Sequence, residues 1–143
     1  MTQPPPDPHN LQRFLDAQAC VTEQVLAELH AGRKRSHWMW FIFPQIAGLG
    51  SSPMAQHFAI SGRNEALAYL AHPNLGPRLC ECTELVNQIP NRTIEEIFGY
   101  PDDLKFRSSV TLFAAVAPAE AVFQRALEKY FGGQPDSATL ARL

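Results

Sequence analysis

The stretch from Arg33 to Gln45, RKRSHWMWFIFPQ, constrains the fold of this chain more than any other part of the sequence. Its three leading cations run directly into a block of aromatic and aliphatic side chains. Between His37 and Phe43 there is neither the alternation of a half-exposed strand nor the polar face of a surface helix. Aromatic side chains of this kind each bury roughly 150–250 Å². We therefore expect the block, including Trp40, to lie in the interior.

Length and charge narrow the class of protein. A chain of 143 residues suits one domain with one core. The net charge of −2 gives no general attraction to nucleic acid or to anionic membranes, so there is no strong case for a nucleic-acid partner. Three cysteines without an apolar signal segment indicate a reducing compartment, and we expect a soluble, cytoplasmic protein that is a monomer or a weak homodimer. No apolar run approaches the ~20 residues that a membrane helix needs.

Most of the remaining sequence has helical periodicity. Residues 1–9, with four prolines, are expected to form a flexible tail, and residues 10–143 a single helical domain. We expect helices at residues 10–32, 52–60, 61–72, 77–89, 93–98, 102–116, 118–131 and 136–143. The last of these is expected to dock Leu140 and Leu143. The pattern predicts an all-α fold, a compact orthogonal array of seven to eight helices with several short ones and no substantial sheet.

Capping signals fix several of these boundaries. Asn10 is expected to cap the first helix and Gly32 to end it. Thr93 and Glu96 have the spacing of a capping box, in which the hydroxyl and the carboxylate each bond an unpaired backbone amide.

Six long motifs resemble one family of small bacterial and fungal proteins, domain of unknown function eighteen-ten, whose members sometimes carry the automatic label calpastatin. The motifs are NLQRFLDAQ at 10–18, GRKRSHWMWFIFPQ at 32–45, GLGSS at 48–52, AYLAHPNLGPRL at 68–79, IFGYPDDLKFRSSVTLFAAV at 97–116 and YFGGQPDSATLARL at 130–143. The resemblance covers nearly the whole chain from Asn10. It implies a compact, mainly helical domain and no established activity.

The 33–45 stretch supplies the first candidate site residues. Arg33 and Lys34 can grip a phosphate, or can form a solvated face that complements the negative end of a helix. His37 can act as a general acid or base near neutral pH, or can be a hydrogen-bonded core histidine. Trp38 can stack on a ring of a ligand, or can pack in the core. Both interpretations stay open for each of these residues.

The segment DDLKFRSSVTLF supplies a second group of candidates. Asp102 or Asp103 is expected to cap its helix. Lys105, Ser108 and Ser109 lie at spacings of three and four, so they share one helical face. This row of donors can bind an anion, or can bond neighbouring carbonyls and fill gaps between helices.

Two further polar residues join the candidates. Gln45 follows the aromatic block directly. Ser52 follows a glycine-rich turn and precedes Pro53, which also makes it a helix-start signal.

The sequence gives little support to nucleophilic catalysis or to metal binding. A serine nucleophile needs a positioned base, and neither a GxSxG nor an SxxK motif occurs. Cys80 and Cys82 lack the CxxC spacing of zinc sites and diverge on a helix. We expect no metal and no cofactor.

The function we infer is binding of an anionic small molecule, for instance a nucleotide-derived one, in a pocket formed by the 33–45 and 102–111 segments. In the sharpest form of this hypothesis, His37, Gln45, Lys105 and Ser109 converge on one concave site. The first alternative is an interaction or scaffold protein with no small-molecule site. The second is a hydrolase of glycoside-type bonds at the same pocket, with His37 or an aspartate of the 102–103 pair as its acid or base.

Overall fold

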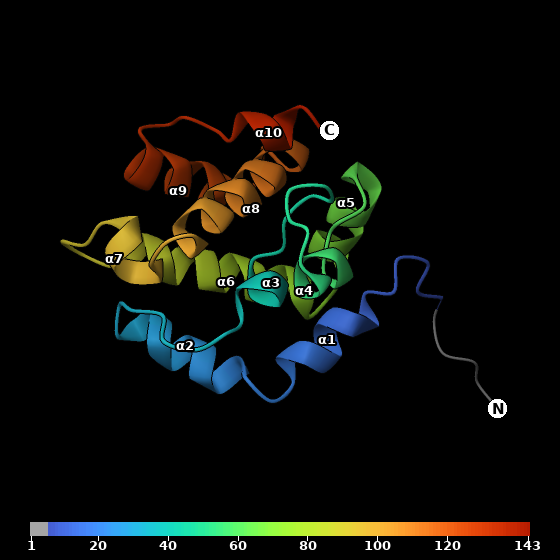
Figure 1. The fold of residues 1–143 in the computed structure, drawn as a ribbon, viewed down its shortest axis with the longest axis horizontal. Helices are drawn as coiled ribbons and strands as arrows, with labels where there is room; N and C mark the ends of the chain where they lie inside the picture. The colour runs from blue at the N-terminus through green and yellow to red at the C-terminus, as the bar shows by residue number, and fades with distance from the viewer. Residues whose placement is uncertain (1–5) are drawn as a thin grey trace.

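Residues 6–143 fold into helices in the computed structural model of the chain (Figure 1). The described part contains ten helices: α1 Gln12–Gln18, α2 Thr22–His30, α3 Met39–Ile42, α4 Pro53–His57, α5 Arg63–Ala71, α6 Leu75–Gln88, α7 Ile94–Phe98, α8 Asp102–Val116, α9 Ala121–Phe131 and α10 Ser137–Leu140. The predicted all-α class is confirmed. Residues 1–5, more than half of the predicted tail, lie outside the described residues.

The two longest helices, α6 and α8, carry most of the packing. Helix α6 runs through the middle of the molecule and contacts α2, α5 and α9. Helix α8 contacts α3, α5, α7, α9 and α10. The loop between α3 and α4 lies near the C-terminal end of the chain, where the Arg142 guanidinium donates to the carbonyl of Gly48 at 3.1 Å. No helix in the described range is long and apolar enough to cross a membrane.

The aromatic block is buried, as its sequence predicts, with Trp40 as the exception. Trp38 exposes only 1% of its surface, and Phe43 is fully buried. The Phe43 ring meets those of Phe98 and Phe106 edge to face, with centroids 5.8 and 5.1 Å apart. These pairs tie α3 to α7 and α8. Trp40 is half-buried and lines a small cavity that adjoins the surface cleft described below.

The first predicted helix is in fact two helices, and its predicted cap is wrong. The chain breaks between α1 and α2, where the Thr22 hydroxyl donates to the carbonyl of Gln18 at 2.8 Å and competes with the helical ladder. Asn10 has a left-handed φ of 51° and does not cap α1. The Asp7 carboxylate does so instead, accepting from the Leu11 amide at 2.7 Å and the Gln12 amide at 2.9 Å.

Other local signals are confirmed. The Ser52 hydroxyl accepts from the Ala55 amide at 3.1 Å and caps α4. Thr93 and Glu96 form the predicted capping box of α7. Splitting of the first helix and the short helix α3 inside the aromatic block together raise the eight predicted segments to ten.

Two boundary predictions in the second half of the chain are wrong, and one packing prediction is wrong in part. Neither Asp102 nor Asp103 caps α8, because both already lie in its first turn. Helix α9 begins at Ala121 rather than at Pro118. Of the two leucines expected to dock the last segment, Leu143 packs against the core, whereas Leu140 is 44% exposed and Thr139 is fully buried instead. The hydroxyl of the buried Thr139 is satisfied, because it donates to the Asp136 carboxylate at 2.6 Å.

Candidate ligand-binding cleft

A cleft of about 450 Å³ lies between the loop after α3, helix α4, the first half of α8 and the segment around α10. Its polar lining residues are Gln45, Ser51, Ser52, Lys105, Ser108 and Asp136. A short parallel bridge positions Gln45, because the Ile60 amide donates to its carbonyl at 2.8 Å. Residues from distant parts of the sequence thus form one concavity.

Lys105 is the cation among the cleft's lining residues in the described part of the chain. Its ammonium lies 5.3 Å from the centre of the Trp40 ring, within the range of a cation–π contact. The same nitrogen is 3.5 Å from an oxygen of Asp102, one turn earlier on α8. The side chain remains 29% exposed, so its ammonium is accessible from the cleft.

A second lysine repeats this arrangement next to the cleft. The Lys34 ammonium lies 2.8 Å from the other oxygen of Asp102 and 5.2 Å from the centre of the Trp38 ring. Two lysines therefore share one carboxylate, and each covers one tryptophan of the aromatic block. The three charged groups carry a net charge of +1, which favours an anion in their neighbourhood.

Ser108 and Asp136 line the cleft but are occupied by structural contacts. The Asp136 carboxylate caps α10, accepting from the Thr139 amide at 3.1 Å. The Ser108 hydroxyl lies 3.2 Å from the same carboxylate and 3.1 Å from the carbonyl of Leu104. Ser108 therefore joins α8 to α10.

The predicted convergence of four residues is wrong for two of them. Gln45 and Lys105 line the same cleft. His37 is exposed and does not line it. Ser109 is fully buried, and its hydroxyl has no hydrogen-bond partner among the described residues. The reason is helical geometry, since the position after Ser108 points inward while Ser108 itself reaches the cleft.

Ser52, Arg33 and Asp103 lie in three different environments. Ser52 lines the cleft while its hydroxyl caps α4. Arg33 is exposed and is not among the cleft residues. Asp103 is half-buried, with one carboxylate oxygen lacking a partner among the described residues. The positions of these residues do not show whether they bind a ligand, so a binding role stays a prediction.

Sequence analysis missed the residue that organises the start of the aromatic block. The Glu28 carboxylate, on α2, accepts from the Arg35 and Ser36 amides at 2.5 and 2.9 Å and from the Trp38 indole at 3.1 Å. Burial opposes its ionisation, but these hydrogen bonds and one from the Ser36 hydroxyl outweigh burial and lower the pKa of Glu28 to about 2. Glu28 thereby fixes the loop that carries Lys34.

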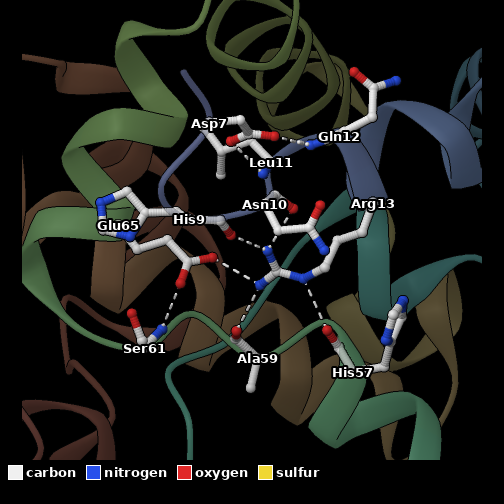
Figure 2. Close-up of polar contacts among 10 residues, drawn as sticks. All are labelled: Asp7, His9, Asn10, Leu11, Gln12, Arg13, His57, Ala59, Ser61 and Glu65. Atoms are coloured by element: carbon white, nitrogen blue, oxygen red, sulfur yellow. Dashed lines mark hydrogen bonds and ion pairs between the residues drawn. The ribbon is translucent and has the colours of Figure 1, made fainter.

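Sequence analysis also missed Arg13, which binds three segments together (Figure 2). Its guanidinium donates to the carbonyl of His57 at 2.8 Å, to that of Ala59 at 2.9 Å and to the Glu65 carboxylate at 2.7 Å. Further donors reach the carbonyls of His9 and Asn10. With its donors engaged in this way, Arg13 has a structural role. A lone arginine on a helix gives no signal of this in the sequence.

The described residues contain no group of three or more His, Cys, Asp or Glu side chains placed to hold a metal ion. Cys82 is buried, and burial raises the pKa of its thiol to about 12. A thiol in this state is a poor nucleophile and a poor ligand.

The family model described as "Protein of unknown function (DUF1810)" matches residues 8–143. The chain belongs to the DUF1810 family. The resemblance stated from the sequence motifs is confirmed, and the family description gives no activity. No protein with a curated description matches the chain.

A solved structure supports both the fold and the family. The chain is similar to the conserved hypothetical protein Rv1873 from Mycobacterium tuberculosis, with 59% sequence identity and a TM-score of 0.95. The match covers 96% of this chain and 98% of that one. The description of that protein names no ligand or reaction.

Proposed function

We propose that the cleft binds an anionic small molecule, with Lys105 as its charged contact. The observation that carries the proposal is the position of the Lys105 ammonium, which is partly exposed on the cleft wall and held over the Trp40 ring. An ammonium has three donors, and Asp102 is its one ionic partner among the described residues. Lys105 thus retains the capacity to bind a ligand.

The surrounding groups support this assignment. Asp102 is shared with Lys34, so its charge does not neutralise Lys105 alone. Gln45 and Ser51 line the same cleft and add an amide and a hydroxyl that can orient a ligand. The cleft volume of about 450 Å³ falls within the range of roughly 300–1,000 Å³ that is usual for small-molecule sites.

A nucleotide-derived ligand is the more specific form of this proposal. It would place its phosphate near Lys105 and would need a ring to stack on. Trp40 offers only part of its surface, because Lys105 already covers one face of the ring. The support for this form is therefore the positive charge of Lys105, with only part of one aromatic ring available for a base.

The test is a dye-monitored melting screen with nucleotides, ADP-ribose, sugar phosphates and dicarboxylates. A ligand that binds only the native state raises the transition temperature, by an amount that grows with its concentration relative to Kd. Lys105→Ala should abolish the shift. Its ligand-free stability should change by no more than about 1 kcal/mol, because the substitution opens no core cavity and removes one cation–π contact. Arg63→Ala is the matched control, since Arg63 is an exposed cation outside the cleft.

The scaffold alternative is supported by two exposed apolar side chains near the start of α8, one of which lines the cleft. Tyr100 is 75% exposed and Leu104, which lines the cleft, is 47% exposed. Exposed apolar groups of this size favour contact with a partner protein. If no anion in the screen shifts the transition of the wild-type protein, the small-molecule proposal is wrong and this alternative takes its place.

The hydrolase alternative has weaker support, because its candidate acid and base residues do not line the cleft. His37 does not line the cleft, and neither does Asp102 or its neighbour Asp103. The carboxylate of Asp102 is also held between two ammonium groups. The carboxylate that does line the cleft, that of Asp136, is engaged as a helix cap.

A further inference from the structure

A small apolar slot adjoins the cleft beneath Lys105. Gln45, Ala55 and Lys105 line both cavities, which places the slot at the inner end of the cleft. The rest of its wall consists of Met39, Trp40, Phe43 and Phe58. The slot has a volume of about 20 Å³, close to the ~10–15 Å³ that a single water molecule requires. It can therefore accept a group of one or two heavy atoms.

The chemistry of its wall disfavours water. A buried water molecule usually makes about three hydrogen bonds, and among the side chains that line the slot only those of Gln45, Lys105 and Trp40 carry a polar group. The apolar side chains of Met39, Phe43, Ala55 and Phe58 form the rest of the wall. A small alkyl group fills the slot more favourably than water does, because it needs no hydrogen bonds and removes apolar surface from water.

The charges around the cleft set the charge of the ligand. Lys105 supplies one positive charge, while the Asp136 carboxylate lines the same cleft. A dianion such as a phosphate monoester would gain from one cation and be repelled by the carboxylate that lines the same cleft. A carboxylate with a single charge is matched to one ammonium with less repulsion.

We propose that the ligand class of this cleft is a small monocarboxylate bearing a short alkyl chain, with the carboxylate on Lys105 and the chain end in the slot of Met39, Trp40, Phe43 and Phe58. This proposal rests on the proposed function, because it takes the anion contact at Lys105 as given. It narrows that function from anions in general to one charge type and one size of apolar group.

The proposal predicts a dependence of affinity on chain length. Each methylene that enters the slot should improve Kd about fourfold, the ratio expected for burying one CH₂. A slot of this volume accepts one or two carbons, so the improvement should stop within a few carbons. We therefore expect Kd to pass through a minimum between acetate and pentanoate.

The experiment is a titration of the full chain, followed by ¹H–¹⁵N NMR, with the linear carboxylates from formate to octanoate at constant ionic strength. The primary alcohols of matching length and methyl phosphate complete the series. In wild type we expect the minimum in Kd described above, with alcohols and methyl phosphate at least tenfold weaker than the best carboxylate. Lys105→Ala should lose carboxylate binding.

Two variants change the slot in opposite directions. Ala55→Val should close it, so that the Kd values of formate and butyrate in that variant come within about twofold of each other. Phe58→Leu should enlarge it and move the minimum to a longer chain. Ala71→Val, at an exposed position on α5, is the matched control for Ala55→Val and should keep the wild-type profile.

The outcomes separate this proposal from the broader one. Carboxylates that bind through Lys105 with the same Kd at every length would leave anion binding intact and overturn the slot. Tighter binding of methyl phosphate would overturn the charge argument in the same way. If affinity rises steadily to octanoate in both wild type and Ala55→Val, the chains bind an open apolar surface rather than a slot, and the slot proposal is wrong. No binding of any anion, here or in the melting screen, would overturn the proposed function itself.

Discussion

Trp38 and Trp40 come from one stretch of sequence and lie in opposite kinds of polar environment. Trp38 is 1% exposed, and its indole donates to the Glu28 carboxylate, which is itself 7% exposed and also bonded by two backbone amides. Trp40 is half-buried next to the Lys105 ammonium and lines the small slot that adjoins the cleft. The first environment is closed and its carboxylate is saturated, whereas the second is open to solvent.

The difference separates polar groups that build the fold from polar groups that remain available. A buried carboxylate must be satisfied, and once Glu28 has accepted several hydrogen bonds it has little capacity for a ligand. Lys105 has three donors and a single, rather long ionic contact with Asp102 at 3.5 Å. Saturation of hydrogen-bonding capacity, more than polarity or position in a motif, distinguishes the two.

The largest expected effect tests the closed environment. Trp38→Ala should lower the free energy of unfolding by about 3–5 kcal/mol, the range for removal of a large buried aromatic side chain. Trp40→Ala should cost less, about 1–3 kcal/mol, because the ring is half-buried and its loss opens the structure toward solvent. Urea unfolding of both variants measures the difference. Equal midpoints for Trp38→Ala and Trp40→Ala would contradict the comparison.

The next effect uses pH to isolate the Glu28 carboxylate. Its pKa is about 2 in the folded protein, against a usual value of 4.5. A depressed pKa stabilises the fold at pH values above the unfolded-state pKa, and this stabilisation is lost as the pH falls from about 5 to about 2. At about 1.4 kcal/mol for each unit by which the pKa is lowered, the stabilisation amounts to about 3 kcal/mol.

Glu28→Gln should remove this dependence. Wild type should exceed Glu28→Gln in stability by up to about 3 kcal/mol at pH 7, and the gap should shrink between pH 5 and pH 2. Urea unfolding at several pH values gives the gap directly. Glu95→Gln, at an exposed position on α7, controls for the loss of one negative charge. A gap that stays constant down to pH 2 would show that the Glu28 carboxylate is not held as its contacts indicate.

The sequence revealed local features and hid those made by distant residues. The capping box of Thr93 and Glu96 spans four positions, so its chemistry is legible from spacing alone. The helical segments are legible for the same reason, because each depends on periodicity within one turn or two. The break between α1 and α2 is not recognisable from the sequence. The Thr22 hydroxyl competes there with the helical hydrogen bonds, and no proline or glycine marks the position.

The candidate site was legible only in part. The spacing on one helical face predicts Lys105 and Ser108 as site residues, and both line the cleft. The charge of Lys34 marks it as a candidate, but nothing in the spacing predicts that Asp102 joins it to Lys105. Which tryptophan would be closed and which open could not be predicted, because the answer depends on Glu28 and on the loop before α4.

The smallest expected effect concerns the open environment, where Asp102 sits between the two lysines. Asp102→Asn removes a negative charge that competes with the ligand for the Lys105 ammonium. At a separation of ~6 Å in a water-like dielectric, one unit charge contributes about 0.7 kcal/mol, so the affinity for an anion that binds at Lys105 should rise about threefold at low salt. The gain in affinity should fall in ~0.5 M salt, where the Debye length is shorter than the distance between the charges.

The measurement is a titration at two ionic strengths, with Asp16→Asn, at an exposed position on α1, as the control for net charge. Lower affinity in Asp102→Asn would mean that Asp102 positions the Lys105 side chain more than it competes with the ligand, and the open environment would then be as preorganised as the closed one.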